Sequence, residues 1–276
     1  MTGTVWWKLS WTEKRSADTG SVYMKNKEKW SLRIFFTVVA MGVALLVCLA
    51  ADKPSQAEIA VISYAREHGI SASEYPDFVI DMLERNPEME EFILNYPFRE
   101  DLLTDLSGYD RSQGVPLLMQ WDKRWGYRDY SGSMVAATGS GPLCVAMAGY
   151  YLTGETKFYP ENVVQFAIDN EYYAAGGSKP TLISEGGPAL GLAVKAVSVV
   201  EDKMAIYLRA GNPMIAAVGP GDFTASSHFI VLTGWKDGMV TVHDPNSYVN
   251  SGKEWSYTEL APQITNLWVI KPGEAG

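Results

Sequence analysis

The longest apolar run in the chain covers residues 34–51, which carry no charged side chain. Four basic residues come shortly before it: Lys25, Lys27, Lys29 and Arg33. A helix of this length nearly spans the hydrocarbon core of a bilayer, and a basic flank is typical of the cytoplasmic side. We therefore expect residues 1–33 in the cytoplasm and everything after residue 51 outside it.

Two interpretations of residues 34–51 remain open. A signal peptide would use the small residues near Cys48–Ala50 or Ser55–Ala57 for cleavage, whereas a transmembrane anchor better suits an apolar run longer than the usual signal core. Lipidation of Cys48 is disfavoured because the bulky Val47 precedes it. A core helix is disfavoured as well, because an uninterrupted apolar run with basic residues on one side only is not typical of one. Residues 1–23 do not resemble a targeting segment, so we expect Met24 to be the true start.

Between residues 52 and 110 the apolar positions follow helical spacing and are broken by prolines. The apolar face of one predicted helix consists of Phe78, Ile80, Met82 and Leu83. Pro87 ends this helix, and a second apolar run stops before Pro97. We interpret residues 52–110 as a helical neck, in which His68 lies at a helix end and has a structural role.

From residue 111 onward the chain is rich in aromatic residues and glycine. Helical patterns cover residues 142–153, 160–170, 184–196 and 201–210, and strand patterns cover residues 213–218, 229–235, 239–243 and 266–270. Helices that precede strands in this way predict an α+β domain over residues 111–276. Gly186, Gly187 and Gly191 lack the leading strand and the Lys-Ser/Thr of a nucleotide site, so we interpret them as a loop and a helix start.

Charge and residue types exclude several classes of function. The chain has a net charge of −9, and the part after residue 51 is more acidic still, which would repel nucleic acid and anionic lipid headgroups. Cys48 and Cys144 are the only cysteines, and Cys48 lies in the apolar run, so no disulfide framework is expected. The three histidines are scattered and have no zinc spacing. We expect no metal and no cofactor.

The stretch Thr138-Gly-Ser-Gly-Pro-Leu-Cys-Val-Ala-Met147 predicts a turn that leads into a helix. Pro142 suits the first helical turn, and glycine flanks the residue before the helix on both sides. Such a turn directs a side chain toward a helix N-terminus, where the helix dipole favours negative charge. The residue in that position is Ser140.

A tight hairpin is predicted where residues 229–235 and 239–243 flank Lys236-Asp-Gly. Centring the turn between residues 236 and 237 sets position 228 opposite 244 or 245, so that His228 and Asp244 become neighbours. A carboxylate beside an imidazole fixes the tautomer and stabilises the imidazolium. The alternative is that His228 merely begins a strand and Asp244 opens an Asp-Pro-Asn turn. Strand alternation turns His243 to the opposite face, where we expect a structural role.

Several blocks of this sequence resemble papain-like cysteine peptidases related to the bacteriocin-processing double-glycine peptidases, cysteine peptidase family thirty-nine. The resemblance rests on Gln120, Gly139-Ser-Gly-Pro142, Ser227-His228-Phe-Ile-Val-Leu-Thr-Gly and Val242-His-Asp244-Pro-Asn-Ser, and it covers roughly residues 115–270. It implies a papain-like fold with an N-terminal helical part packed on an antiparallel sheet. By the same resemblance, Gln120 would donate to an oxyanion, Ser140 occupies the nucleophile position, His228 is the base and Asp244 orients it.

The nucleophile position departs from the family pattern, which has cysteine there. An imidazolium and a helix N-terminus can lower a thiol's pKa from about 8.5 toward neutrality, whereas a serine hydroxyl must lose its proton during attack. Three explanations of Ser140 stay open: an engineered inactivation, a natural inactive protein, or a switch to serine chemistry. Cys144 lies one helical turn further on, so we expect it in the packing below the site; the alternative is that it acts as the nucleophile.

These features predict an exported or membrane-anchored bacterial peptidase-like protein that hydrolyses peptide bonds by acyl transfer, with Ser140 as a source of inactivity. The expected partner is a peptide or protein substrate. The alternatives are a catalytically silent module that binds peptides or envelope fragments on the same fold, and a structural envelope protein whose neck presents a globular head.

Overall fold

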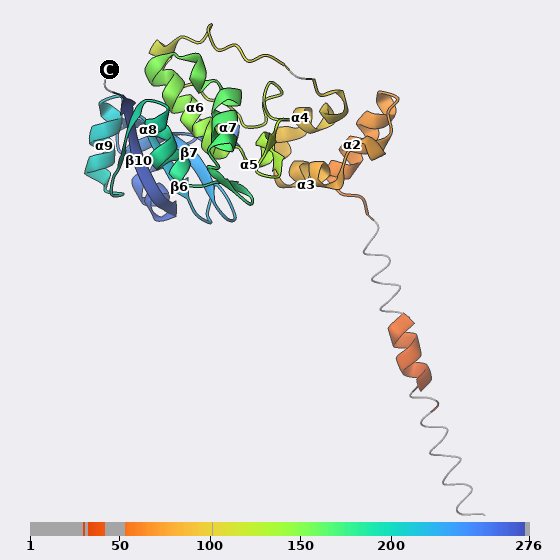
Figure 1. Ribbon diagram of the computed structural model, residues 1–276. Helices are drawn as coiled ribbons and strands as arrows, with labels where there is room; N and C mark the ends of the chain where they lie inside the picture. The colour runs from red at the N-terminus through yellow and green to blue at the C-terminus, as the bar shows by residue number, and fades with distance from the viewer. Residues whose placement is uncertain (1–29, 31–32, 42–52, 101, 274–276) are drawn as a thin grey trace, which may run out of the picture. The chain divides into compact units, whose positions relative to one another are not determined.

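The computed structural model describes residues 30, 33–41, 53–100 and 102–273 (Figure 1). The chain divides into two compact units, residues 1–55 and residues 56–276. In the first unit, residues 33–41 are helical. Among the described residues, no helix has both the length and the apolar character that a membrane crossing requires. Much of the predicted signal or anchor segment 34–51, and Met24, lie outside the described residues.

The predicted helical neck consists of three short helices: α2 (Gln56–Glu67), α3 (Asp77–Arg85) and α4 (Glu90–Leu94). Asn86 ends α3, and its side chain accepts a hydrogen bond from the Glu88 N–H (3.1 Å), which begins the 3-10 turn Pro87–Met89. The apolar faces of these helices form one buried cluster, which also includes Met134 and Ala136. The neck and the predicted peptidase domain therefore belong to one compact unit (Figure 1).

Helix α6 (Ser140–Thr153) is the central helix of this unit. Its first eleven residues are all buried, which explains why its sequence shows no polar stripe. It follows α5 (Val135–Thr138) after a single non-helical residue, Gly139, and packs beside α7 (Pro160–Asp169). Gly154 ends α6 in the left-handed conformation (φ 72°), which glycine adopts without strain. The predicted helices at 142–153 and 160–170 are confirmed.

The sheet has six antiparallel strands in the order β5-β10-β6-β7-β8-β9. The strands are β5 (Leu192–Ala196), β6 (Met214–Val218), β7 (His228–Lys236), β8 (Met239–His243), β9 (Glu254–Ser256) and β10 (Ile264–Pro272). Two further two-stranded pairs are β1 (Asp129–Tyr130) with β2 (Ser133–Met134), and β3 (Tyr173–Ala174) with β4 (Gly177–Ser178). The mixed helix and antiparallel-sheet architecture agrees with the predicted α+β class.

Helices cover both faces of the sheet, because the central strands alternate between two apolar clusters. Ala217, Phe229 and Val231 pack in the same cluster as α6. The intervening residues Ala216 and Ile230 face the opposite cluster, which includes one side of α9 (Glu201–Arg209). This burial on two sides explains the continuous apolar run of β6, whose five residues are all buried.

The predicted helix at 184–196 is wrong in its second half. The helical part ends with the short α8 (Gly187–Ala189), and Gly191 (φ 85°) then turns the chain. Leu192–Ala196 forms the edge strand β5 against β10. Only Leu192 is fully buried in β5, so periodicity carried little signal for a strand. Strand β9 was not predicted.

The predicted β7–β8 hairpin is confirmed, but its turn lies one residue later than expected. Lys236 pairs with Met239, and the two turn residues Asp237 and Gly238 both have positive φ (51° and 83°). This pattern matches a type I′ turn, which follows the natural twist of the strands. A register shift between residues 232 and 234 then changes the pairing further along the hairpin, so that His243 lies opposite residue 231.

Replacing Gly149 with alanine tests the close approach of α6 to Phe158. A Cβ at position 149 would overlap the Phe158 ring, which is fully buried and has no room to move. Alanine favours a helix by about 1 kcal/mol over glycine, whereas overpacking a core costs about 1–3 kcal/mol. Because the added Cβ would overlap several atoms of the ring, the cost should lie in the upper part of that range, about 2–3 kcal/mol, so Gly149→Ala should lower the free energy of unfolding in urea by about 1–2 kcal/mol.

The matched control is Gly252→Ala, in α10 (Tyr248–Gly252), where an added Cβ meets no atom within 4 Å. This variant should be as stable as the wild type or slightly more stable. A Gly149→Ala protein of undiminished stability would contradict the packing described for α6.

Candidate functional site

His228 and Asp244 form a buried pair at one end of the sheet. His228 is the first residue of β7, and Asp244 directly follows β8. The His228 Nε2 lies 2.7 Å from the Asp244 Oδ1, and the two residues are 8% and 1% exposed. The predicted proximity of these two side chains is confirmed, although the hairpin reaches it through a different register.

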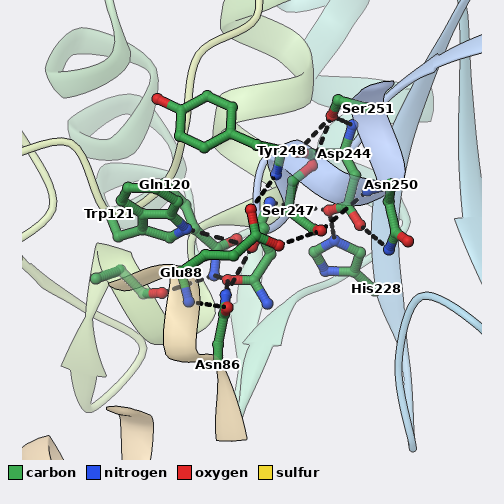
Figure 2. Close-up of polar contacts among 12 residues, drawn as sticks. Asn86, Glu88, Gln120, Trp121, His228, Asp244, Ser247, Tyr248, Asn250 and Ser251 are labelled. Carbon is green, nitrogen blue, oxygen red and sulfur yellow. Dashed lines mark hydrogen bonds and ion pairs between the residues drawn. The ribbon is translucent and has the colours of Figure 1, made fainter. Parts of the chain in front are cut away.

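Further hydrogen bonds hold Asp244 in place (Figure 2). Its Oδ1 also accepts from the Asn246 N–H (2.8 Å), and its Oδ2 accepts from the Asn250 Nδ2 (2.9 Å). The backbone N–H of Asp244 donates to the Ser251 Oγ (2.9 Å). A buried carboxylate needs such partners, since leaving it unsatisfied would be costly. The result is a carboxylate that cannot swing away from His228.

The contact with Asp244 determines which nitrogen of His228 remains available. With Nε2–H donating to the carboxylate, Nδ1 is the nitrogen that carries the lone pair in the neutral ring. Within the described part of the chain, Nδ1 has no hydrogen-bond partner. His228 can therefore accept a proton at Nδ1 while Asp244 stabilises the resulting imidazolium.

Ser140 is the first residue of the fourteen-residue helix α6 and is 8% exposed. Gly139, before it, provides no side-chain cap, and Pro142 has no N–H. The backbone N–H groups of Ser140 and Gly141, in the first turn of α6, have no acceptor within that helix. Side chains of Val135 and Ser178 pack where a Cβ at Gly139 or Gly141 would lie, so glycine is required on both sides. This N-terminus presents the positive end of the helix dipole to an anion.

Cys144 lies one turn further along α6 and is completely buried. Burial raises the pKa of its thiol well above the usual value, and the negative charge of Asp244 raises it further. Cys144 is consequently a protonated thiol at neutral pH, inside the core. This environment supports a packing role rather than a nucleophilic one.

Gln120 is buried and bound to the loop that follows Asp244. Its backbone N–H donates to the Pro245 carbonyl oxygen (2.7 Å), and its Nε2 donates to the Ala136 carbonyl oxygen (2.7 Å) and to the Asn246 Oδ1 (3.3 Å). Both hydrogens of the side-chain amide thus have acceptors within the protein. An oxyanion would have to replace the longer contact, so the donor role of Gln120 stays a prediction.

Two residues that sequence reasoning missed reach the same loop from the helical neck. Glu88 accepts hydrogen bonds from the Ser247 Oγ (2.5 Å) and from the N–H groups of Tyr248 (2.6 Å) and Val249 (3.3 Å). Asn86 donates from Nδ2 to the Asn246 carbonyl oxygen (2.7 Å). In Figure 2 both side chains point from the neck into the loop around Asp244. Asn86-Pro-Glu is recognisable as a local cap, but nothing in its spacing indicates a partner about 160 residues away.

Among the described residues, the two other histidines make no hydrogen bond with this pair, although His243 directly precedes Asp244. His68 follows α2, stacks on Tyr64 and contacts the Tyr64 carbonyl oxygen through Nδ1 (2.9 Å). His243 contacts the Pro116 carbonyl oxygen through Nδ1 (3.4 Å), and burial lowers its pKa. Among the described residues, no group of three or more His, Cys, Asp or Glu side chains is arranged to hold a metal ion.

Removing the Glu88 side chain tests its hold on the loop. Because Glu88 is half-buried and makes charge-assisted hydrogen bonds, we expect Glu88→Ala to lower the free energy of unfolding by about 1 kcal/mol. Hydrogen exchange at the Tyr248 and Val249 amides should become faster. The control is Glu84→Ala, an exposed position in α3, which should leave both measurements unchanged. Unaltered exchange at residues 248 and 249 in Glu88→Ala would contradict the contact.

Comparisons with known proteins place these residues in a family. Two similar solved structures are the peptidase domain of Streptococcus ComA, described as a bi-functional ABC transporter involved in a quorum sensing pathway, and a putative C39-like peptidase from Bacillus anthracis. The ComA peptidase domain is 18% identical, and the match covers 48% of this chain and 90% of that one, with a TM-score of 0.38. The Bacillus anthracis protein is 15% identical, and the match covers 63% of this chain and 100% of that one, with a TM-score of 0.37. A search of curated proteins finds no match. The profile of the Peptidase_C39 like family matches residues 112–271, which include Gln120, Ser140, His228 and Asp244. The chain belongs to the Peptidase_C39 like family.

Proposed function

We propose that this protein is a papain-like peptidase homologue that binds peptides at the His228–Asp244 site and hydrolyses them only slowly, because serine stands at the nucleophile position. The observation that carries the proposal is the buried pair itself: Asp244 holds His228 by Nε2, and no other described residue hydrogen-bonds to Nδ1. This is the arrangement that a general base requires.

In the proposed reaction, the Ser140 hydroxyl oxygen attacks the peptide carbonyl carbon while His228 Nδ1 takes the hydroxyl proton. The N-terminus of α6 stabilises the oxyanion that forms. His228 then gives its proton to the leaving amine, and an acyl ester on Ser140 remains. Water, deprotonated by His228, hydrolyses that ester and returns Ser140 to its starting state.

Serine makes the first step slow for a physical reason. A cysteine in this position would rest as a thiolate, stabilised by imidazolium and by the helix N-terminus, before substrate arrives. The Ser140 hydroxyl is far less acidic, so its proton must leave during attack. A site arranged around a preformed ion pair therefore loses most of its rate while its capacity to bind a peptide is unaffected.

One observation favours the alternative of a silent peptide-binding module on the same fold. Both amide hydrogens of Gln120 already have acceptors, in Ala136 and Asn246. If this arrangement persists when a peptide binds, the site lacks one oxyanion donor as well as a strong nucleophile.

We further propose that the protein is exported and is held in the membrane by residues 34–51. The support is the uncharged apolar run and the basic residues before it. Protease added to intact cells should degrade the part of the chain after residue 51, and complete protection in intact cells would contradict an external location.

Restoring the thiol tests the peptidase site. We expect iodoacetamide to modify Ser140→Cys at position 140 near neutral pH at least about tenfold faster than it modifies Cys144, because only the former lies at a helix N-terminus and burial raises the pKa of the latter. Peptide mapping by mass spectrometry assigns each modified cysteine. The same variant should hydrolyse a mixed peptide library faster than the wild type.

Two controls make the result decisive. Ser140→Cys combined with His228→Ala should lose the fast labelling, whereas Ser140→Cys combined with His243→Ala should keep it. A Ser140→Cys protein with no reactive thiol at any pH would overturn the peptidase-site proposal. Hydrolysis by the wild type as fast as by Ser140→Cys would instead show that the site uses serine chemistry efficiently.

A further inference from the structure

A pocket of about 580 Å³ lies beside the loop that follows Asp244. Its walls come from α4, the turn Tyr96–Phe98, the segment after Gln120 and Tyr248. A smaller pocket of about 260 Å³ shares five of its lining residues and extends to Arg128. We call the larger one the aromatic pocket and the smaller one the basic pocket.

The basic pocket has an excess of positive charge. Arg99, Lys123, Arg124 and Arg128 line it, and Glu100 is the only carboxylate among its lining residues. Arg124 is neutralised by Asp122, which it contacts through Nε (2.9 Å) and Nη2 (2.6 Å). Among the described residues, Lys123 and Arg128 make no ion pair. Because the whole chain is acidic, with a net charge of −9, this positive site is a local feature.

The cationic groups in this pocket are held in place but not fully satisfied. Arg99 lies over the Tyr96 ring at 4.1 Å and donates to the Tyr96 carbonyl oxygen (2.9 Å). The Nε of Arg128 is buried and has no hydrogen-bond partner in the described part of the chain. Buried donors without an acceptor are rare in proteins and call for an explanation. Arg128 as a whole is only half-buried and lines the basic pocket, so a carboxylate there would approach the accessible part of its side chain rather than Nε.

The aromatic pocket connects this charge to the candidate active site. Trp121 directly follows Gln120, and its Nε1 donates to the Asn246 carbonyl oxygen (3.2 Å). Its ring packs edge-on against Tyr248, with 5.1 Å between the ring centroids. Figure 2 shows both rings beside the loop that holds Asp244. The wall of the aromatic pocket thus contacts the loop that follows Asp244, although His228 and Ser140 line neither pocket.

We propose that the basic pocket binds an acidic residue of the peptide, whose chain runs along the aromatic pocket to the His228–Asp244 site. This inference names the substrate class and rests on the proposed function. Guanidinium groups match the planar geometry of a carboxylate, and a fixed guanidinium loses little entropy on binding. Aromatic walls bind peptide side chains of many kinds, so the carboxylate provides the selectivity.

The test compares matched peptides that differ only in charge. Wild-type protein is titrated by calorimetry with a library of short peptides containing one Glu or Asp, and with the same peptides containing Gln or Asn instead. We expect the acidic set to bind about tenfold more tightly at low salt, and the difference to shrink as ionic strength rises. Lys123→Gln/Arg128→Gln should abolish the difference, while its binding of the neutral set stays the same.

Two variants keep the result interpretable. Lys123→Gln alone changes an exposed side chain, so it should fold normally and lose part of the preference. Lys236→Gln removes an equal charge from the β7–β8 hairpin and should keep the full preference. Equal binding of both peptide sets would overturn the inference. A protein that binds phosphatidylglycerol vesicles but does not bind the acidic peptides would also overturn it. The proposed function is judged separately by thiol labelling of Ser140→Cys, so the two failures are distinguishable.

Discussion

The carboxylate of Asp244 is the constraint on which the candidate site depends. It is almost completely buried, and its negative charge is compatible with that burial because a histidine, a backbone amide and an asparagine side chain all point at it. Removing one partner of such a buried group typically costs about 3–5 kcal/mol. The same contacts that stabilise the fold here also orient His228. Local stability and the geometry of the candidate site therefore share one set of interactions, and a change in the loop from residue 244 to 251 would affect both.

The fold depends much less on the side chain of Ser140 than on that of Asp244. The glycines on either side are required by packing against Val135 and Ser178, but the Ser140 side chain makes no hydrogen bond within the described residues. Serine and cysteine are close in size, so the backbone around position 140 accommodates either. A serine or a cysteine at this position would therefore leave the rest of the candidate site unchanged. The order of the His228–Asp244 pair does not depend on which of the two residues stands at position 140.

Much of this arrangement was readable from the sequence where periodicity or turn chemistry is strong. Helix α6, the β7–β8 hairpin and the pairing of His228 with Asp244 all followed from local patterns. Strand β5 was predicted as helix because an edge strand with one buried residue has no clear alternation. No sequence pattern indicates the contacts of Asn86 and Glu88, because only the tertiary fold brings the neck to a loop about 160 residues away. The pockets beside Trp121 were missed for the same reason.

The hydrogen bonds from the amides of residues 248 and 249 to Glu88 affect which residues a fragment must contain to keep the candidate site ordered. The family-matched region starts at residue 112, yet the acceptor for those amides lies before it. A fragment trimmed to the matched region would contain every residue of the candidate site and still leave the start of α10 exposed and unpaired. The region that the family profile matches is thus shorter than the region that holds the loop after Asp244 in place. The longer region includes the helices of the neck, which the profile does not cover.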